Sequence, residues 1–401
     1  MNRQDSTTAR PIGALRPEAG PLAKALAGLS ALAVAMGIGR FAFTPVMPMM
    51  MQDAGLSIAS GGLLASANYL GYLLGALSAM VVRIRPEHAI RGGLLAVAVL
   101  TLAMGMQLPF AVWLVLRLLA GMASAWVLIS VSAWCMGSLA RYQRPFLNSL
   151  VFAGVGTGIA LAGLLCLALI RAEAPSPQAW LSMGLLSLAV AAATWRFFRA
   201  TDAAAGGPTA HARYKWNMDA VRLVFCYGVF GFGYIIPATF LPVMARNALQ
   251  DSSLFGWSWP IFGLAAALST LAVAWLVARM GNRRLWMLSH FVMAAGVVLP
   301  AVMPGLLAVF VAALCVGGTF MVITLAALQE GKRIAAGNAT VLIAAMTSAF
   351  AAGQIIGPLT VSGAGGGSFS TALVIAAVLL AGSALLLGRG QDNRLERKEA
   401  T

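Results

Sequence analysis

Two arginines lie deep inside long apolar runs of this sequence. Arg40 is about twelve residues, or ~18 Å of helix, from the end of its run near Gln52, and Arg117 is about eight residues, or ~12 Å, from the nearer end of its own. A guanidinium at such depth in a bilayer costs at least ~2.5–3.5 kcal/mol, so each side chain must face protein or water and needs an acceptor. Because Arg can hold a carboxylate through two parallel hydrogen bonds, the two arginines predict an anionic substrate.

A structural role is the alternative for both arginines. Backbone carbonyls freed near Pro45 or near the neighbouring glycines could accept from either guanidinium and tie helices together. The sequence leaves both roles open.

Other polar side chains occur inside apolar runs and extend the candidate site. Thr44 shares a helix face with Arg40, and Tyr69 and Tyr72 accompany an asparagine in the second run. The predicted substrate-binding residues are Arg40, Thr44, Asn68, Arg117, Tyr234 and Gln354. Such faces, polar beside apolar, suit an amphiphilic ligand. Ordinary hydrogen bonding between helices is the alternative for any one of these polar side chains.

Acidic residues are missing where a proton or cation carrier would need them. None of the 12 Asp and Glu residues lies near the centre of an apolar run. If protons are coupled to the activity, they would travel with the substrate acid itself. His290, the only histidine near such a run, is expected to lie at the membrane interface.

No motif for enzymatic chemistry or for a cofactor is present. The four cysteines form no CxxC pair, and neither HExxH nor GxxxxGK[ST] occurs. Gly154, Gly156 and Gly158 sit within an apolar run without a preceding strand, which favours close helix packing over a nucleotide loop. We therefore expect neither an enzyme nor a metal or other cofactor.

Composition supports an integral membrane protein. Of 401 residues, 60% are hydrophobic and only 10% are charged, against an average near 25% charged in soluble proteins. The net charge of +15 could indicate a nucleic-acid partner, but the basic residues stand in short patches between apolar runs. This pattern favours membrane topology and a lipid partner, not nucleic acid.

Twelve apolar runs reach or approach the ~20 residues that a helix needs to cross a bilayer. They lie at about 24–50, 58–82, 90–107, 110–138, 146–170, 179–197, 218–245, 254–278, 285–303, 305–329, 338–361 and 369–388. The sequence thus predicts an all-α membrane protein with a tail at 1–23, six helices in 24–197, a linker at 198–217, six helices in 218–388 and a tail at 389–401.

Basic residues predict the orientation of these spans. Apart from Arg40 and Arg117, which are inside spans, all but Arg171 and Arg246 of the 27 Lys and Arg residues lie in the termini and in alternate loops. By the positive-inside rule both termini are expected in the cytoplasm.

The two predicted halves share a weak internal repeat. The segments 37–50 and 231–244 align without gaps, at an offset of 194 residues, and Gly121 aligns with Gly317 at a similar offset. Arg40 corresponds to Tyr234 in this alignment. Two six-span halves at a nearly constant offset are typical of parallel repeats about an axis along the membrane normal.

Several segments resemble the major facilitator superfamily. The segment 279–284, Arg-Met-Gly-Asn-Arg-Arg, is similar to its basic loop motif, although Ala278 replaces the usual preceding acid. Segments 117–121 and 352–358 resemble motifs of the fourth and eleventh spans, and 37–45 is similar to the hallmark of the YbfB/YjiJ-type branch. The resemblance implies that spans one, four, seven and ten line a central cavity. It also implies conformational gating by Arg279, Gly281, Arg283 and Arg284.

The expected function is secondary active or facilitated transport by alternating access, in a monomer. The predicted substrate is a small organic anion with an apolar portion. Efflux of amphiphilic drugs or metabolites is the alternative, and a membrane-embedded enzyme or a receptor without flux are further classes.

Overall fold

The computed structural model describes residues 20–82, 84–139, 142, 144–198, 216–248, 252–303, 305–335, 339–363 and 369–399. Most of the predicted linker and the N-terminal tail lie outside these residues. The described chain is helical and contains no strand, and twelve helical segments are long and apolar enough to cross a membrane. The predicted all-α fold with twelve spans is therefore confirmed.

The N-terminal half contains six spans, of which the first is broken. Its elements are α1 (Pro21–Leu32), the π-helix η1 (Ala33–Ile38), α2 (Phe43–Asp53), α3 (Ile58–Val81), α4 (Pro86–Met104), α5 (Phe110–Leu139), α6 (Pro145–Arg171) and α7 (Ser176–Thr194). The sequence predicted one continuous run at 24–50, whereas the structure divides this span into α1, η1 and α2.

The C-terminal half contains the other six spans and one short helix. Its elements are α8 (Met218–Ala248), α9 (Ser252–Phe255), α10 (Ser258–Met280), α11 (Asn282–Val302), α12 (Leu306–Ile334), α13 (Ala339–Gly363) and α14 (Phe369–Glu399). Helix α14 continues past residue 388, so the segment expected as a tail extends the last helix.

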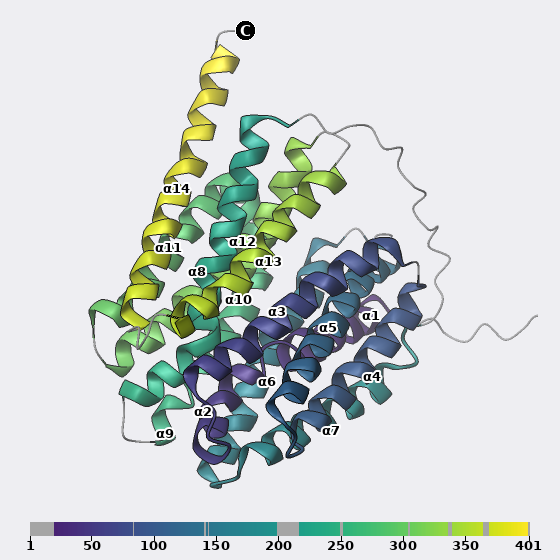
Figure 1. The fold of residues 1–401 in the computed structure, drawn as a ribbon. Helices are drawn as coiled ribbons and strands as arrows, with labels where there is room; N and C mark the ends of the chain where they lie inside the picture. Colours follow the sequence, from purple (N-terminus) through teal and green to yellow (C-terminus); the bar gives the residue numbers. More distant parts are fainter. Residues whose placement is uncertain are drawn as a thin grey trace, which may run out of the picture.

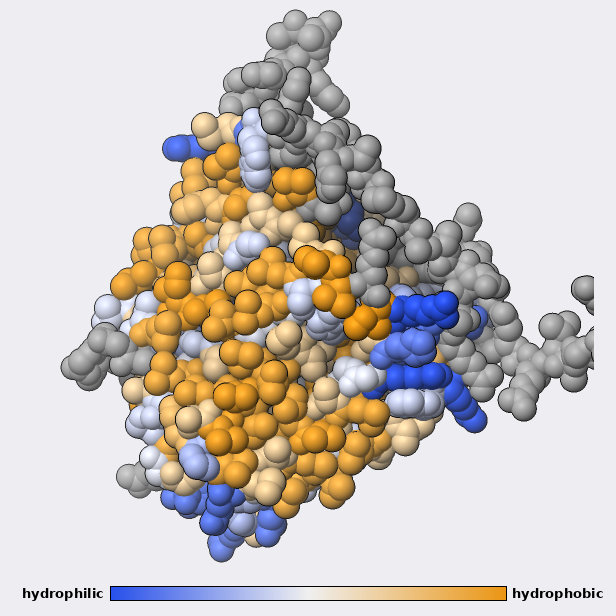
Figure 2. Space-filling model, turned by 45° about the vertical axis from the view of Figure 1, so that its right-hand side comes forward, coloured by the Kyte–Doolittle hydropathy of each residue, from blue (hydrophilic) through white to orange (hydrophobic). Residues whose placement is uncertain are grey.

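The two halves lie side by side, with the purple-to-blue helices in one group and the teal-to-yellow helices in the other (Figure 1). Leucine and valine side chains are exposed on the outer helix faces, among them Leu185, Leu264 and Leu385, each more than half exposed. Figure 2 shows a broad apolar surface over one side of the molecule. An apolar exterior is stable in contact with lipid and not with water.

Glycines set the distances between helices of each half. A Cβ on Gly121 of α5 would stand 2.0 Å from the carbonyl oxygen of Asn68 in α3, and one on Gly317 of α12 would stand 2.4 Å from that of Phe262 in α10. Gly121 and Gly317, aligned in the sequence, thus make equivalent close contacts in the two halves. Small residues at such crossings let helix backbones touch.

The glycines of α6 lie at close contacts with a helix of its own half and with a helix of the other half. Gly154 and Gly158 face the first span of the same half, where a Cβ would lie 2.1 Å and 2.2 Å from backbone oxygens. Gly156 faces the other half, and its Cβ would lie 2.3 Å from the nitrogen of Ala267 in α10. On the facing helix, a Cβ on Gly263 would lie 2.2 Å from the nitrogen of Ala160. The close-packing interpretation of this glycine run agrees with these contacts.

Five side-chain hydrogen bonds join the halves within the described residues. They pair Arg40 with Gln354, Thr44 with Ala238, Ser66 with Ile355, Tyr69 with Thr239, and Arg246 with Pro48. We call the bundle end where α2 ends and α3 begins the distal end, opposite the end where α1 begins. All five bonds lie between the middle of the bundle and the distal end, so the halves are closed against each other there.

The glycine contacts give a first prediction. Gly317→Ala should lower the thermal midpoint of the purified protein, by an amount equivalent to about 1–3 kcal/mol, because its methyl group meets the backbone of α10. The neighbouring Gly318 has open space at its Cβ position, so Gly318→Ala is the matched control and should leave the midpoint unchanged or raise it. Equal midpoints for the two variants would contradict this packing.

Candidate functional site

The break in the first span creates an unusual backbone around Arg40. In η1 and the turn after it, the Gly39 N–H donates to the Val34 carbonyl at 2.9 Å. Pro45 has no N–H to offer to Phe41, and the Thr44 N–H donates to the Phe41 carbonyl at 3.2 Å instead of reaching Arg40. The Arg40 carbonyl is thereby left for a partner from outside the segment. π-Helical turns of this kind frequently mark functional sites.

Arg117 and Asn68 supply donors to this backbone. Arg117 donates from Nη2 to the Arg40 carbonyl at 3.0 Å and from Nη1 to the Gly39 carbonyl at 3.3 Å. Asn68 Nδ2 donates to the Arg117 carbonyl at 2.8 Å and to the Gly39 carbonyl at 3.3 Å. Arg117 is 2% exposed and Asn68 is fully buried. This geometry matches the structural alternative for Arg117, in which freed carbonyls hold the guanidinium.

Arg40 is held differently, by side chains of both halves. It is 3% exposed, and its Nη2 donates to Oε1 of Gln354 in α13, while its Nε has no acceptor. The guanidinium carbon lies 4.0 Å from the ring centre of Tyr72 and 5.4 Å from that of Tyr69. Within the described chain Arg40 forms no ion pair. This buried cation is thus in contact with an amide oxygen and with aromatic side chains, and with no carboxylate among the described residues.

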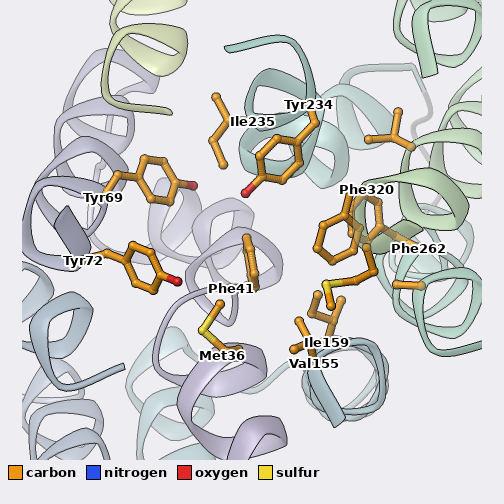
Figure 3. Packing of buried hydrophobic residues seen from close by; sticks show 14 of the residues in the cluster. Met36, Phe41, Tyr69, Tyr72, Val155, Ile159, Tyr234, Ile235, Phe262 and Phe320 are labelled. Carbon is orange, nitrogen blue, oxygen red and sulfur yellow. The ribbon is translucent and has the colours of Figure 1, made fainter. Parts of the chain in front are cut away.

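Tyr234 completes the group from the C-terminal half. Its hydroxyl accepts from Nε2 of Gln354, and its ring lies parallel to Phe320 (5.7 Å between centres, 3°) and to Phe350 (5.7 Å, 9°). Figure 3 shows the hydroxyl groups of Tyr69, Tyr72 and Tyr234 pointing into one region from opposite sides. We call Arg40, Tyr69, Tyr72, Tyr234 and Gln354 the Arg40 cluster.

The structure therefore divides the predicted substrate-binding residues. It brings Arg40, Tyr234 and Gln354 together, and it places Arg117 and Asn68 behind them on the backbone. Thr44 donates to the Ala238 carbonyl at 2.8 Å and so belongs to the closed distal contact. The sequence did not identify Phe320 and Phe350. Phe350 could have been found, because it precedes Gln354 by four residues and shares its helix face.

The predicted gating residues lie at the opposite end of the bundle. Arg279 stacks on Trp275 of its own helix at 4.0 Å, and Gly281 forms the turn between α10 and α11 with φ of 75°. Arg284 is exposed. Their described contacts remain within the C-terminal half.

Arg283 joins four helices of that half. It donates to both carboxylate oxygens of Asp219 in α8, at 2.8 Å and 3.1 Å, and to the Leu387 carbonyl of α14 at 2.9 Å. It also lies 4.0 Å from Glu330 of α12, which pairs with Arg333. In this state the basic loop stabilises one half, and its role in gating stays a prediction.

The expectation for His290 was wrong. The side chain is fully buried beside Trp286 and Phe230, with Nδ1 3.2 Å from the Trp286 carbonyl. Its place near the start of a span suggested an interfacial residue, but its face of α11 points into the C-terminal half.

The two arginines should respond differently to truncation. Arg117→Met should lower the thermal midpoint clearly, because it removes the donors to buried carbonyls, each worth about 1–3 kcal/mol when left unpaired. Arg40→Met should change the midpoint little, because the loss of its hydrogen bond is offset by the removal of a charge that is costly to bury. Melting curves of both variants in detergent test this difference, and the reverse order would assign the structural role to Arg40.

Comparison with known proteins agrees with this architecture. The sequence profile of the family described as "Uncharacterised MFS-type transporter YbfB" matches residues 32–388. A search of curated proteins gives no match. Among solved structures, the crystal structure of a point mutant of the nucleoside transporter NupG is similar, with a TM-score of 0.70 and 15% identity, covering 92% of this chain and 99% of that one. At this identity the similarity shows the fold alone. The family match over most of the chain is decisive: this protein belongs to the YbfB-type family of major facilitator superfamily (MFS) membrane transporters.

Proposed function

We propose that this transporter carries a small organic anion with an apolar portion, and that Arg40 binds the charged group. The observation that carries the proposal is a buried guanidinium at the contact of the two halves, with an unpaired Nε and no carboxylate partner among the described residues. A carboxylate can accept two parallel hydrogen bonds from such a guanidinium and neutralise its charge. An anionic ligand would thus give the unpaired Nε an acceptor and neutralise the buried positive charge.

The apolar portion follows from the surroundings of Arg40. Tyr72, Tyr69 and Phe41 border the guanidinium, and the parallel rings of Phe320, Tyr234 and Phe350 continue from the same region into the C-terminal half. Aromatic faces favour planar or apolar groups through dispersion and burial of surface. An acid with a hydrocarbon or aromatic body therefore fits better than a strongly hydrated polyanion.

Alternating access is supported by the distribution of contacts between the halves. Their hydrogen bonds gather toward the distal end, while the cluster stands in the middle of the bundle. With both termini in the cytoplasm, as the basic residues predict, the distal end faces outward, and this state is closed to the outside. Ligand binding would bias the inward and outward states through different contacts in each.

Energy coupling is proposed without a cofactor. The most buried carboxylate described, Glu330 at 1% exposed, lies near the cytoplasmic end predicted for α12 and is paired with Arg333. Because no described acid accompanies Arg40, a coupled proton would move with the substrate acid. The monomer in the inner membrane is the proposed working unit.

Binding can be tested without knowing the direction of transport. Sodium salts of acetate, benzoate and octanoate should raise the thermal midpoint of the purified protein, since a ligand that binds only the folded state adds about 2.7 kcal/mol at 100 times its Kd. Arg40→Ala should remove this effect. Stabilisation by lipophilic cations such as tetraphenylphosphonium, retained in Arg40→Ala, would instead favour efflux of amphiphilic drugs.

The orientation can be tested separately. A protease-cleavable tag fused after Thr401 should be cut in inside-out vesicles and protected in right-side-out vesicles. The reason is that most basic residues lie in the termini and in the loops on the same side of the membrane, which the positive-inside rule assigns to the cytoplasm. Cleavage with the opposite pattern would reverse the assignment of the closed end to the outside.

A further inference from the structure

We infer that Gln354 is an internal ligand of Arg40, which holds the place of the substrate's charged group until an anion displaces it. This inference rests on the proposed function and adds a residue that sets specificity and couples binding to movement. Gln354 is fully buried in α13 of the C-terminal half and accepts from Arg40 of the N-terminal half. It is the residue through which α13 reaches the guanidinium.

The chemistry of the side-chain amide explains why it is an incomplete ligand. A carboxamide has the planar shape of a carboxylate, but only one of its two terminal atoms accepts hydrogen bonds. Oε1 accepts from Nη2 of Arg40, whereas Nε2 is turned to the Tyr234 hydroxyl and donates to it. The amide therefore offers the guanidinium one acceptor atom and not the two parallel acceptors of a carboxylate, and Nε of Arg40 has no partner.

A carboxylate in the same place would satisfy the donors of Arg40 that face Gln354, including the unpaired Nε. It could accept from Nε and Nη2 of Arg40 together, and it would supply the charge that the amide lacks. The Tyr234 hydroxyl now accepts from Gln354, so its own proton remains available for donation to an anion. Arg40 and Tyr234, from different halves, would then hold the ligand between them, and Gln354 would be released.

This exchange changes a link between the halves. In the present state Arg40 is tied to α13 through Gln354, while Ser66 of α3 donates to the Ile355 carbonyl, the next residue of α13, at 3.1 Å. Displacing the amide removes one of two adjacent bonds between α13 and the N-terminal half. An anion would thereby loosen this contact and shift the balance between the two states of the transporter.

Two substitutions of Gln354 separate this idea from a merely structural hydrogen bond. Gln354→Glu keeps the shape and provides the missing charge, so the thermal midpoint without added anion should rise and benzoate should bind at least tenfold more weakly. Gln354→Leu removes the internal ligand, so benzoate should bind at least as tightly as in the unmodified protein. Thermal shifts across a titration of sodium benzoate, against sodium chloride at equal ionic strength, measure both. Gln178→Glu, at an exposed position of α7, controls for an added charge and should behave like the unmodified protein.

The outcomes are distinct from those for the proposed function. Unchanged benzoate binding in Gln354→Glu, or lost binding in a folded Gln354→Leu, would overturn the internal ligand while the anion site of Arg40 stands. If benzoate stabilises none of the proteins, the proposed function is weakened. The thermal midpoints measured without anion then decide whether Gln354 is an internal ligand of Arg40. A higher midpoint for Gln354→Glu then supports pairing of this position with Arg40, and an equal or lower one overturns it. Gel filtration confirms that each variant is folded.

Discussion

The interrupted backbone of the first span is the constraint on which the site depends. A membrane helix that stops hydrogen-bonding to itself must find donors elsewhere, and here they come from Arg117 and Asn68. With these donors in place, the chain can turn at residues 39–42 and hold Arg40 against the other half. One buried cation, Arg117, thus holds the backbone that positions the other, Arg40.

The two halves have a common architecture but differ in charge at the centre. Equivalent glycines pack equivalent helices in each half, whereas Arg40 has Tyr234 at the corresponding position in the C-terminal half. Arg40, Tyr69 and Tyr72 of the Arg40 cluster therefore come from the N-terminal half, and Tyr234 and Gln354 come from the C-terminal half. In the proposed complex the charged group of the ligand would contact Arg40 of one half and Tyr234 of the other, so that relative movement of the halves would change these contacts.

Much of the fold could be predicted from the sequence, because the length of an apolar run and the spacing of basic residues reflect the bilayer directly. The break at Ala33–Ile38 could not, since glycine and proline also occur in unbroken spans. Within the site, the burial of Arg40 was predictable from its position in a run. Its pairing with Gln354, 314 residues away, was not, because it depends on how two packed halves meet. The burial of His290 could not be predicted either, because it depends on which face of its helix packs against the other helices.

The contact between α6 and α10 has a mechanical consequence. At Gly156 and Gly263 the two backbones touch directly, and no long side chain interlocks across these two positions. Interlocked side chains would resist sliding and rotation, whereas two bare backbone surfaces fix only the distance between the helix axes. If one half turns against the other during transport, this contact would keep the distance between the axes of α6 and α10 constant at that point.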